Sequence, residues 1–180
     1  MRPKKPEKVK LFASILSGNP ELIEAAMDRL SERFGTIDYM SPLLPFDHTD
    51  YYEKEMGRAL VRRIASYEKL IEADELADIK LLTNSIEDEF LTADGRRQVN
   101  IDPGYLALDK VVLASCKNYS HRVYLKDGVY AEVTLRYSAR SKEYEAFQWT
   151  YPDYREPTMQ GLFGEIRRRY SKQIGRGTKG

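Results

Sequence analysis

The residues of this sequence that could do chemistry are carboxylates and cations gathered in four short polar segments. The first segment, residues 96–105, contains Asn100 and Asp102. In an extended strand these two side chains point to the same side, and we expect Pro103-Gly104 to form a turn that places Asp102 at the strand end. There, Asp102 could hold a divalent cation or orient a ligand hydroxyl. It could equally cap the turn.

The second segment, residues 117–122, is a polar loop between two predicted strands and could present Lys117 and Arg122 to an anion. Basic hairpin loops are also common simply because they are solvated. On the following hairpin, Glu132 shares a face with Tyr130. If that face is interior, the carboxylate needs a partner, which would be a ligand site or an ion pair with an arginine.

The third and fourth segments place carboxylates beside aromatic residues. Asp153 lies between tyrosines in residues 150–155, and residues 47–52 contain His48 between two aspartates. The chain has 13 tyrosines, whose rings could stack on a base or a sugar. Tyrosines also commonly fill the boundary between core and water.

Our first functional hypothesis is a protein that binds a small molecule or nucleotide in a polar pocket built from these segments. Carboxylates and cations together suit an anionic, phosphorylated ligand held with a divalent metal such as Mg²⁺. The candidate ligand-binding residues are Asn100, Asp102, Tyr105, Lys117, Arg122, Glu132, Asp153 and Tyr154. The candidate metal ligands are Asp102, Glu132 and Asp153. Whether the protein is an enzyme stays open.

The alternative is a non-catalytic module that contacts a protein or RNA through exposed tyrosines and basic ends. The formal net charge is +1, but residues 1–10 carry five basic and one acidic side chain, and residues 165–180 carry six and one. The intervening chain therefore has a net charge of −8. This acidic body argues against a broad nucleic-acid-binding face and leaves RNA contact to the two ends.

Several known site types are excluded by their missing motifs. There is no Gly-Lys dipeptide, so no P-loop, and the one Gly-x-Gly-x-x-Gly lies at residues 175–180 with no helix after it. Nucleophile elbows of the Gly-x-Ser-x-Gly type are missing. The single cysteine, Cys116, and the two histidines lack the paired spacings of a structural zinc site. We expect Cys116 to be a small buried core residue.

The length of 180 residues and the hydrophobic content of 42% suit one domain over residues 1–180, with a body at about 8–174 and loose basic tails at 1–7 and 175–180. No apolar run approaches the length of a membrane span, and no signal peptide is convincing, so we expect a cytoplasmic protein without a membrane partner.

Hydrophobic periodicity and turn signals predict an α+β domain in which helices pack on a mixed sheet with an antiparallel meander in its C-terminal half. We predict strands at residues 9–17, 36–46, 97–102, 110–117, 122–126, 129–135 and 147–151. Helices are predicted at residues 20–34, 56–71, 74–90 and 159–170. Asn19 should cap the first helix, and Asp127-Gly128 should turn a hairpin.

Several longer stretches carry a resemblance to a known family. The most specific are Asn-x-Asp-Pro-Gly-Tyr at residues 100–105 and Thr-Tyr-Pro-Asp-Tyr at residues 150–154, together with residues 49–57 and 128–135. Over residues 8–170 the chain resembles the domain of unknown function 4416 family of uncharacterised bacterial proteins. The resemblance implies no established activity or catalytic residue. Members often carry an automatic GTP-binding label, but this chain lacks both the P-loop and the Asn/Thr-Lys-x-Asp element, so a nucleotide would need another kind of site.

Overall fold

A computed structural model of the chain describes residues 2–46, 56, 57 and 59–176. In chain order the elements are β1 (Val9–Ser17), α1 (Pro20–Phe34), β2 (Ile37–Met40), β3 (Leu44–Phe46), β4 (Leu60–Ile71), a 3₁₀ turn (Ala73–Glu75), α3 (Leu76–Asp88), β5 (Val99–Leu106), β6 (Lys110–Ser115), β7 (Val123–Lys126), β8 (Val129–Ser138), β9 (Glu143–Ala146), α4 (Pro152–Arg155) and α5 (Pro157–Gln173).

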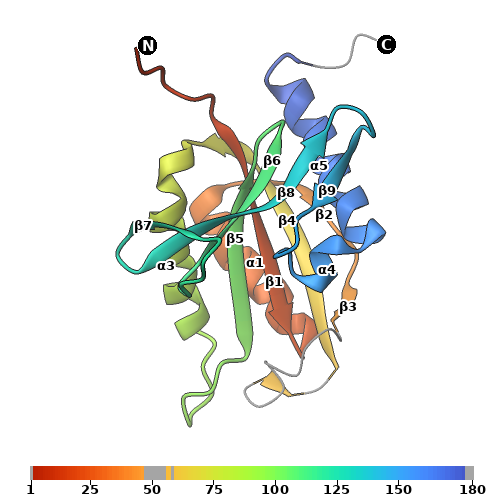
Figure 1. The fold of residues 1–180 in the computed structure, drawn as a ribbon. Coiled ribbons are helices and arrows are strands. Elements are labelled where there is room, and N and C mark those ends of the chain that lie inside the picture. Colours follow the sequence, from red (N-terminus) through yellow and green to blue (C-terminus); the bar gives the residue numbers. More distant parts are fainter. Residues whose placement is uncertain (1, 47–55, 58, 177–180) are drawn as a thin grey trace.

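The described strands form one nine-stranded sheet in the order β2-β4-β1-β5-β6-β8-β7, with β3 added to β4 and β9 added to β8. Every pairing among them is antiparallel, where we had expected a mixed sheet. Figure 1 shows α3 on one side of the sheet and α5 on the other. The α+β class and the C-terminal meander are confirmed.

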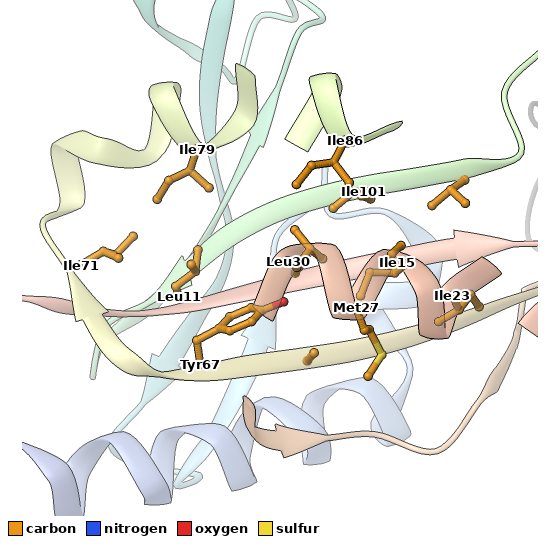
Figure 2. Close-up of a cluster of buried hydrophobic side chains, with 14 of the residues drawn as sticks. Leu11, Ile15, Ile23, Met27, Leu30, Tyr67, Ile71, Ile79, Ile86 and Ile101 are labelled. Atoms are coloured by element: carbon orange, nitrogen blue, oxygen red, sulfur yellow. The ribbon is translucent and has the colours of Figure 1, made fainter. Parts of the chain in front are cut away.

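Strand β1 is an interior strand of the sheet, and all nine of its residues are buried. It pairs with β4 and β5 along its two edges, and separate core clusters cover its two faces. On one face Leu11 and Ile15 pack against α1 and α3, as Figure 2 shows. On the other face Phe12 meets Phe163 of α5 with ring centroids 4.9 Å apart. This double burial explains why the strand is a continuous apolar run without alternation.

The sequence signals at the two ends of α1 are confirmed. Asn19 accepts a hydrogen bond from the backbone N–H of Glu21 at 2.9 Å, and Pro20 occupies the first turn. Gly35 ends the helix with φ of 86°, a conformation that glycine adopts without steric cost. The predicted hairpin is also present, because Asp127 and Gly128 join β7 to β8 with φ of 49° and 79°.

The helix predicted over residues 56–71 is wrong, because residues 60–71 form strand β4. Leu60 and Ile64 are four residues apart, and this spacing puts them on one face of a helix or of a strand alike. The middle section of β4 is buried on both faces, because Ala65 and Tyr67 pack in one core cluster and Ile64 in the other, so it shows no strand alternation. The spacing of apolar residues in this segment therefore fitted a helix although the segment is a strand.

The turn predicted at Pro103-Gly104 is also wrong, because β5 continues through both residues to Leu106. Pro103 pairs with Ala13 of β1, whereas pairing with β6 begins only at Gly104. A proline has no N–H to donate, and here its nitrogen lies on a flank of β5 that has no partner strand. Residues 147–151, predicted as a strand, form a loop after β9.

The fourth polar segment, at residues 47–52, lies outside the described residues. None of the helices that the structure describes is both long and apolar enough to cross a membrane.

Candidate functional site

The site begins where β5 and β6 stop pairing. Their register joins Gly104 to Leu113 and continues only towards Leu106. Towards the other end of β5 the two strands part, and helix α3 takes the place of β6. Lys80 Nζ donates to the carbonyl oxygen of Ile101 at 2.8 Å, and Glu87 accepts from the N–H of Ile101 at 2.6 Å. Two side chains thus supply the hydrogen bonds that a neighbouring strand would have made.

A cavity of about 690 Å³ opens at this divergence. Its lining comes from β3, β4, α3, β5, β6, β8 and α4 and from the loops before β5, after β6 and before α4. The charged and amide side chains that line it are Arg62, Lys80, Asn84, Glu87, Asp88, Arg97, Asn100, Asp102, Lys117, Arg122, Glu132 and Asp153. The sheet register explains the convergence, since Leu16 of β1 pairs with both Arg62 and Asn100, which places these two on the same face.

Arg62 is a buried cation in the wall of this cavity, with an exposed fraction of only 7%. Its guanidinium pairs with the buried carboxylate of Asp153 in α4. It also lies 4.5 Å from the ring centre of Phe46 and 5.5 Å from that of Tyr154. Its Nε has no hydrogen-bond partner among the described residues.

A second network joins α3 to β5. Asp102 accepts from Lys80 Nζ at 3.2 Å through Oδ1 and from Asn100 Nδ2 at 2.8 Å through Oδ2. Burial acts to raise the pKa of Asp102, but Lys80, Asn100 and Arg62 together outweigh it and hold that pKa below its ordinary value. Asp102 is therefore ionised at neutral pH.

Glu87 behaves in the opposite way. Burial raises the pKa of its carboxyl to about 7, although Lys80 at 3.9 Å and the Ile101 N–H both favour the charged form. Near neutral pH this carboxyl is thus close to half protonated. It can act there as either a donor or an acceptor towards a ligand.

The third network is centred on Glu132, whose exposed fraction is 2%. Arg122 Nε donates to Glu132 Oε2 at 2.8 Å, and His121 Nε2 lies 3.0 Å from the same oxygen. Arg122 also donates to Ser115 Oγ at 2.8 Å and to the carbonyl of Lys117 at 2.9 Å. The partner that a buried Glu132 was expected to need is therefore Arg122.

Seven of the eight candidate ligand-binding residues line this one cavity: Asn100, Asp102, Lys117, Arg122, Glu132, Asp153 and Tyr154. Tyr105 does not. Side chains of a strand alternate between the two faces of the sheet, and Tyr105 points to the face opposite Asn100 and Asp102. There it packs against the core cluster under α1 and α3. Cys116 is exposed rather than buried, because β6 ends at Ser115 and the cysteine begins the loop.

The candidate metal ligands Asp102, Glu132 and Asp153 share the cavity, but each is paired with a cation from a different element. In the described part of the chain no three His, Cys, Asp or Glu side chains are grouped so that they could hold a metal ion. The three carboxylates, as the structure describes them, thus form separate ion pairs with Lys80, Arg122 and Arg62.

Sequence reasoning missed Arg62, Lys80, Asn84 and Glu87. The first was assigned to a helix that is in fact β4, and the other three lie within a correctly predicted helix. Lys80 and Glu87 are seven residues apart, a spacing that puts them on one helix face, and this was the signal available in the sequence.

The comparisons with known proteins bear on this chain as a whole. The model of the family described as Domain of unknown function (DUF4416) matches residues 7–170. The chain belongs to the DUF4416 family. No curated protein and no solved structure matches it significantly. Because the DUF4416 match spans β1 to α5, it includes every element that lines the cavity.

Proposed function

We propose that this protein binds a small phosphorylated molecule that also carries hydroxyl groups, such as a sugar phosphate, in the cavity between β5 and β6. A volume of about 690 Å³ lies within the range of roughly 300–1,000 Å³ that is usual for small-molecule sites. The lining combines aromatic rings with 12 charged or amide side chains, which makes it more polar than most small-molecule sites and suits a charged, hydroxylated ligand.

Arg62 is the observation that carries the proposal. Buried side-chain donors almost always have a partner, and one left without it costs about 1–3 kcal/mol. The Nε of Arg62 has none among the described residues, although the side chain lines the cavity and is nearly fully buried. An anionic oxygen of a ligand would satisfy this donor. Arginine is well suited to phosphate, because its planar fork matches the phosphate oxygens.

The carboxylates explain why the ligand should also carry hydroxyls. Each buried carboxylate of the described lining faces a cation: Glu87 and Asp102 face Lys80, Glu132 faces Arg122, and Asp153 faces Arg62. Paired carboxylates no longer repel an anion strongly, yet each keeps oxygen lone pairs that can accept from ligand hydroxyls. A sugar phosphate offers both the anion and the hydroxyls.

Thermal unfolding with and without ribose 5-phosphate tests this proposal. At a concentration about 100 times the Kd, binding should add about 2.7 kcal/mol and raise Tm by roughly 5–10 °C for a chain of this size. Arg62→Lys keeps a cation beside Asp153 but removes Nε, and should weaken binding at least ten-fold. Arg63→Lys is the matched control, because Arg63 lies next along β4 and outside the cavity lining.

The proposal is wrong if neither ribose 5-phosphate, inorganic phosphate nor any of the four nucleoside 5′-monophosphates shifts Tm of the unmodified protein. It is also wrong if binding is equal in the Arg62→Lys and Arg63→Lys variants while both remain folded.

A further inference from the structure

A second hollow, of about 210 Å³, adjoins the cavity. It is lined by Tyr119, His121, Arg122, Trp149, Thr150, Tyr151 and Pro152. Four of these residues, Tyr119, Arg122, Tyr151 and Pro152, also line the main cavity. The two spaces are therefore neighbours, and we call the smaller one the rim hollow.

The rim hollow is walled by near-parallel aromatic rings. Trp149 and His121 have centroids 5.7 Å apart with planes at 15°, and His121 and Tyr119 have centroids 5.9 Å apart with planes at 9°. On its other side Trp149 stacks on Phe147 at 4.6 Å and 4°. These rings stack on one another, so a flat ligand ring can add to them only at an edge or on a face that no other ring covers.

These rings are exposed although their size makes exposure unfavourable. The exposed fractions are 51% for Tyr119, 40% for Trp149 and 46% for Tyr151. They come from two loops that are far apart in sequence, the loop after β6 and the loop before α4. Exposed aromatic residues gathered at a hollow are characteristic of ligand sites.

The loop that carries Trp149 and Tyr151 is also held rigidly. Trp149 Nε1 donates to the carbonyl of Val133 at 3.0 Å, and Thr150 Oγ1 donates to the carbonyl of Thr134 at 2.6 Å. Arg155 Nε donates to the carbonyl of Thr150 at 2.7 Å. Rings fixed in this way lose little conformational entropy when a ligand binds. The unfavourable free energy of ordering the loop is therefore small.

We propose that the rim hollow binds a planar heteroaromatic ring whose attached phosphate lies in the main cavity, so that the ligand is a nucleoside phosphate. This inference rests on the proposed function, since it extends the phosphate site outwards. The rim hollow is too small for a whole ligand of ordinary size, but it borders the space that would take the sugar and phosphate. The guanidinium of Arg122 and the imidazole of His121 also line it.

Trp149 is the only tryptophan of the chain, so its fluorescence reports directly on this hollow. We would titrate the protein with the four nucleoside 5′-monophosphates and with ribose 5-phosphate, following tryptophan emission and binding heat together. The expected result is that at least one nucleotide quenches Trp149 and binds ten-fold or more tightly than ribose 5-phosphate, which should leave the emission unchanged.

A pair of matched variants separates stacking from phosphate binding. Trp149→Leu removes a ring that lines the rim hollow but not the main cavity, and it should weaken nucleotide binding, measured as heat, about ten-fold while leaving ribose 5-phosphate binding unchanged. Tyr124→Leu is the control, because Tyr124 is similarly exposed, at 58%, but lines neither space. Both variants alter exposed residues, so folding should be preserved.

The possible results are distinguishable. Equal binding of ribose 5-phosphate and of all four nucleotides, without quenching, overturns the ring site and leaves the phosphate site standing. Nucleotide binding heat that is unchanged by Trp149→Leu also overturns it. Failure of every compound to bind overturns the proposed function and this inference with it.

Discussion

Glu87 is the residue whose protonation most directly links the site to stability. Its carboxyl is buried, it accepts the N–H of Ile101, and its pKa is raised from 4.5 to about 7. Between these two values the folded protein holds a proton that the unfolded chain has released. Stability is therefore greatest below about pH 4.5 as far as this group is concerned, and it falls as the pH rises through 7.

Replacing Glu87 by Gln should remove this dependence. The amide oxygen can still accept from Ile101, and the side chain no longer ionises. We expect the unfolding free energy of the unmodified protein, relative to Glu87→Gln, to fall by roughly 2–3 kcal/mol between pH 4.5 and pH 8. Urea unfolding of both proteins at several pH values measures this difference. A difference that stays constant with pH would contradict the assigned pKa.

At the residue scale, much of the candidate site was predictable from sequence. Four residues of the site were recognisable because they are polar, lie in strands or at strand ends, and serve no obvious structural purpose in the sequence. They are Asn100, Arg122, Glu132 and Asp153. Arg62 was not recognisable, because its role depends on which strand lies beside β4 and on the later segment that carries Asp153. No local pattern encodes such a long-range pair.

At the scale of elements, β5 is shaped by Gly104. A Cβ built there would lie 2.5 Å from the backbone oxygen of Val112 and 2.5 Å from Cζ of Phe12. Such distances are far below van der Waals contact, and the backbone oxygen belongs to the neighbouring strand. Glycine at this position therefore lets β6 approach β5 just before the two strands diverge.

Gly104→Ala should consequently destabilise the protein, by about 1–3 kcal/mol or more, since it overpacks a fully formed sheet. Gly161→Ala is the control. Gly161 is exposed in α5 with nothing within 4 Å of its added Cβ, so alanine should stabilise by about 0.5–1 kcal/mol. Chemical unfolding of both variants gives the comparison, and equal effects of the two substitutions would refute this account of β5.

The elements themselves were predictable to different degrees. Helices α1, α3 and α5 carry an apolar stripe on one face, and this period identifies them without tertiary information. Strand β4 does not, because burial on both faces removes the alternation that marks a half-exposed strand. The Pro103-Gly104 pair was also mispredicted because of the tertiary structure. A proline can lie at this point of β5 only because the flank opposite β1 has no partner strand there.

At the scale of the whole molecule, the two ends of the described chain are joined. Lys10 of β1 is fully buried, and its Nζ pairs with Asp38, donates to the carbonyl of Tyr67 at 3.0 Å and donates to Oε1 of Gln173 at 2.6 Å. Figure 1 shows the start of β1 and the end of α5 at the same end of the sheet. Arg176 and Glu7 form a further ion pair there, at 2.6 Å.

Gln173→Ala should therefore destabilise the whole protein although Gln173 is exposed. It removes one of the three partners of the buried Lys10 ammonium and a bond to the carbonyl of Glu68, and we expect a loss of about 1–3 kcal/mol. Lys172→Ala, at the next exposed position of α5, should change stability by only about 0.5 kcal/mol or less. Equal small losses in thermal or urea unfolding would show that Lys10 does not need Gln173.

The same junction bears on the RNA-binding alternative. Several basic residues of the ends already face carboxylates, as Arg168 and Arg169 face Glu165 and Lys5 faces Glu72. RNA contact through the ends stays a prediction, for which a salt-dependent gel shift is the test.

The interior position of β1 also governs how this protein can be made. Of the described strands β1 is synthesised first, yet its two neighbours are β4 and β5, which end at residues 71 and 106. Until β5 has emerged from the ribosome, a strand that is buried along its whole length in the folded protein has an open edge. A nascent chain of this topology therefore exposes an unpaired apolar strand until residue 106 has been synthesised, and such strands are prone to aggregate.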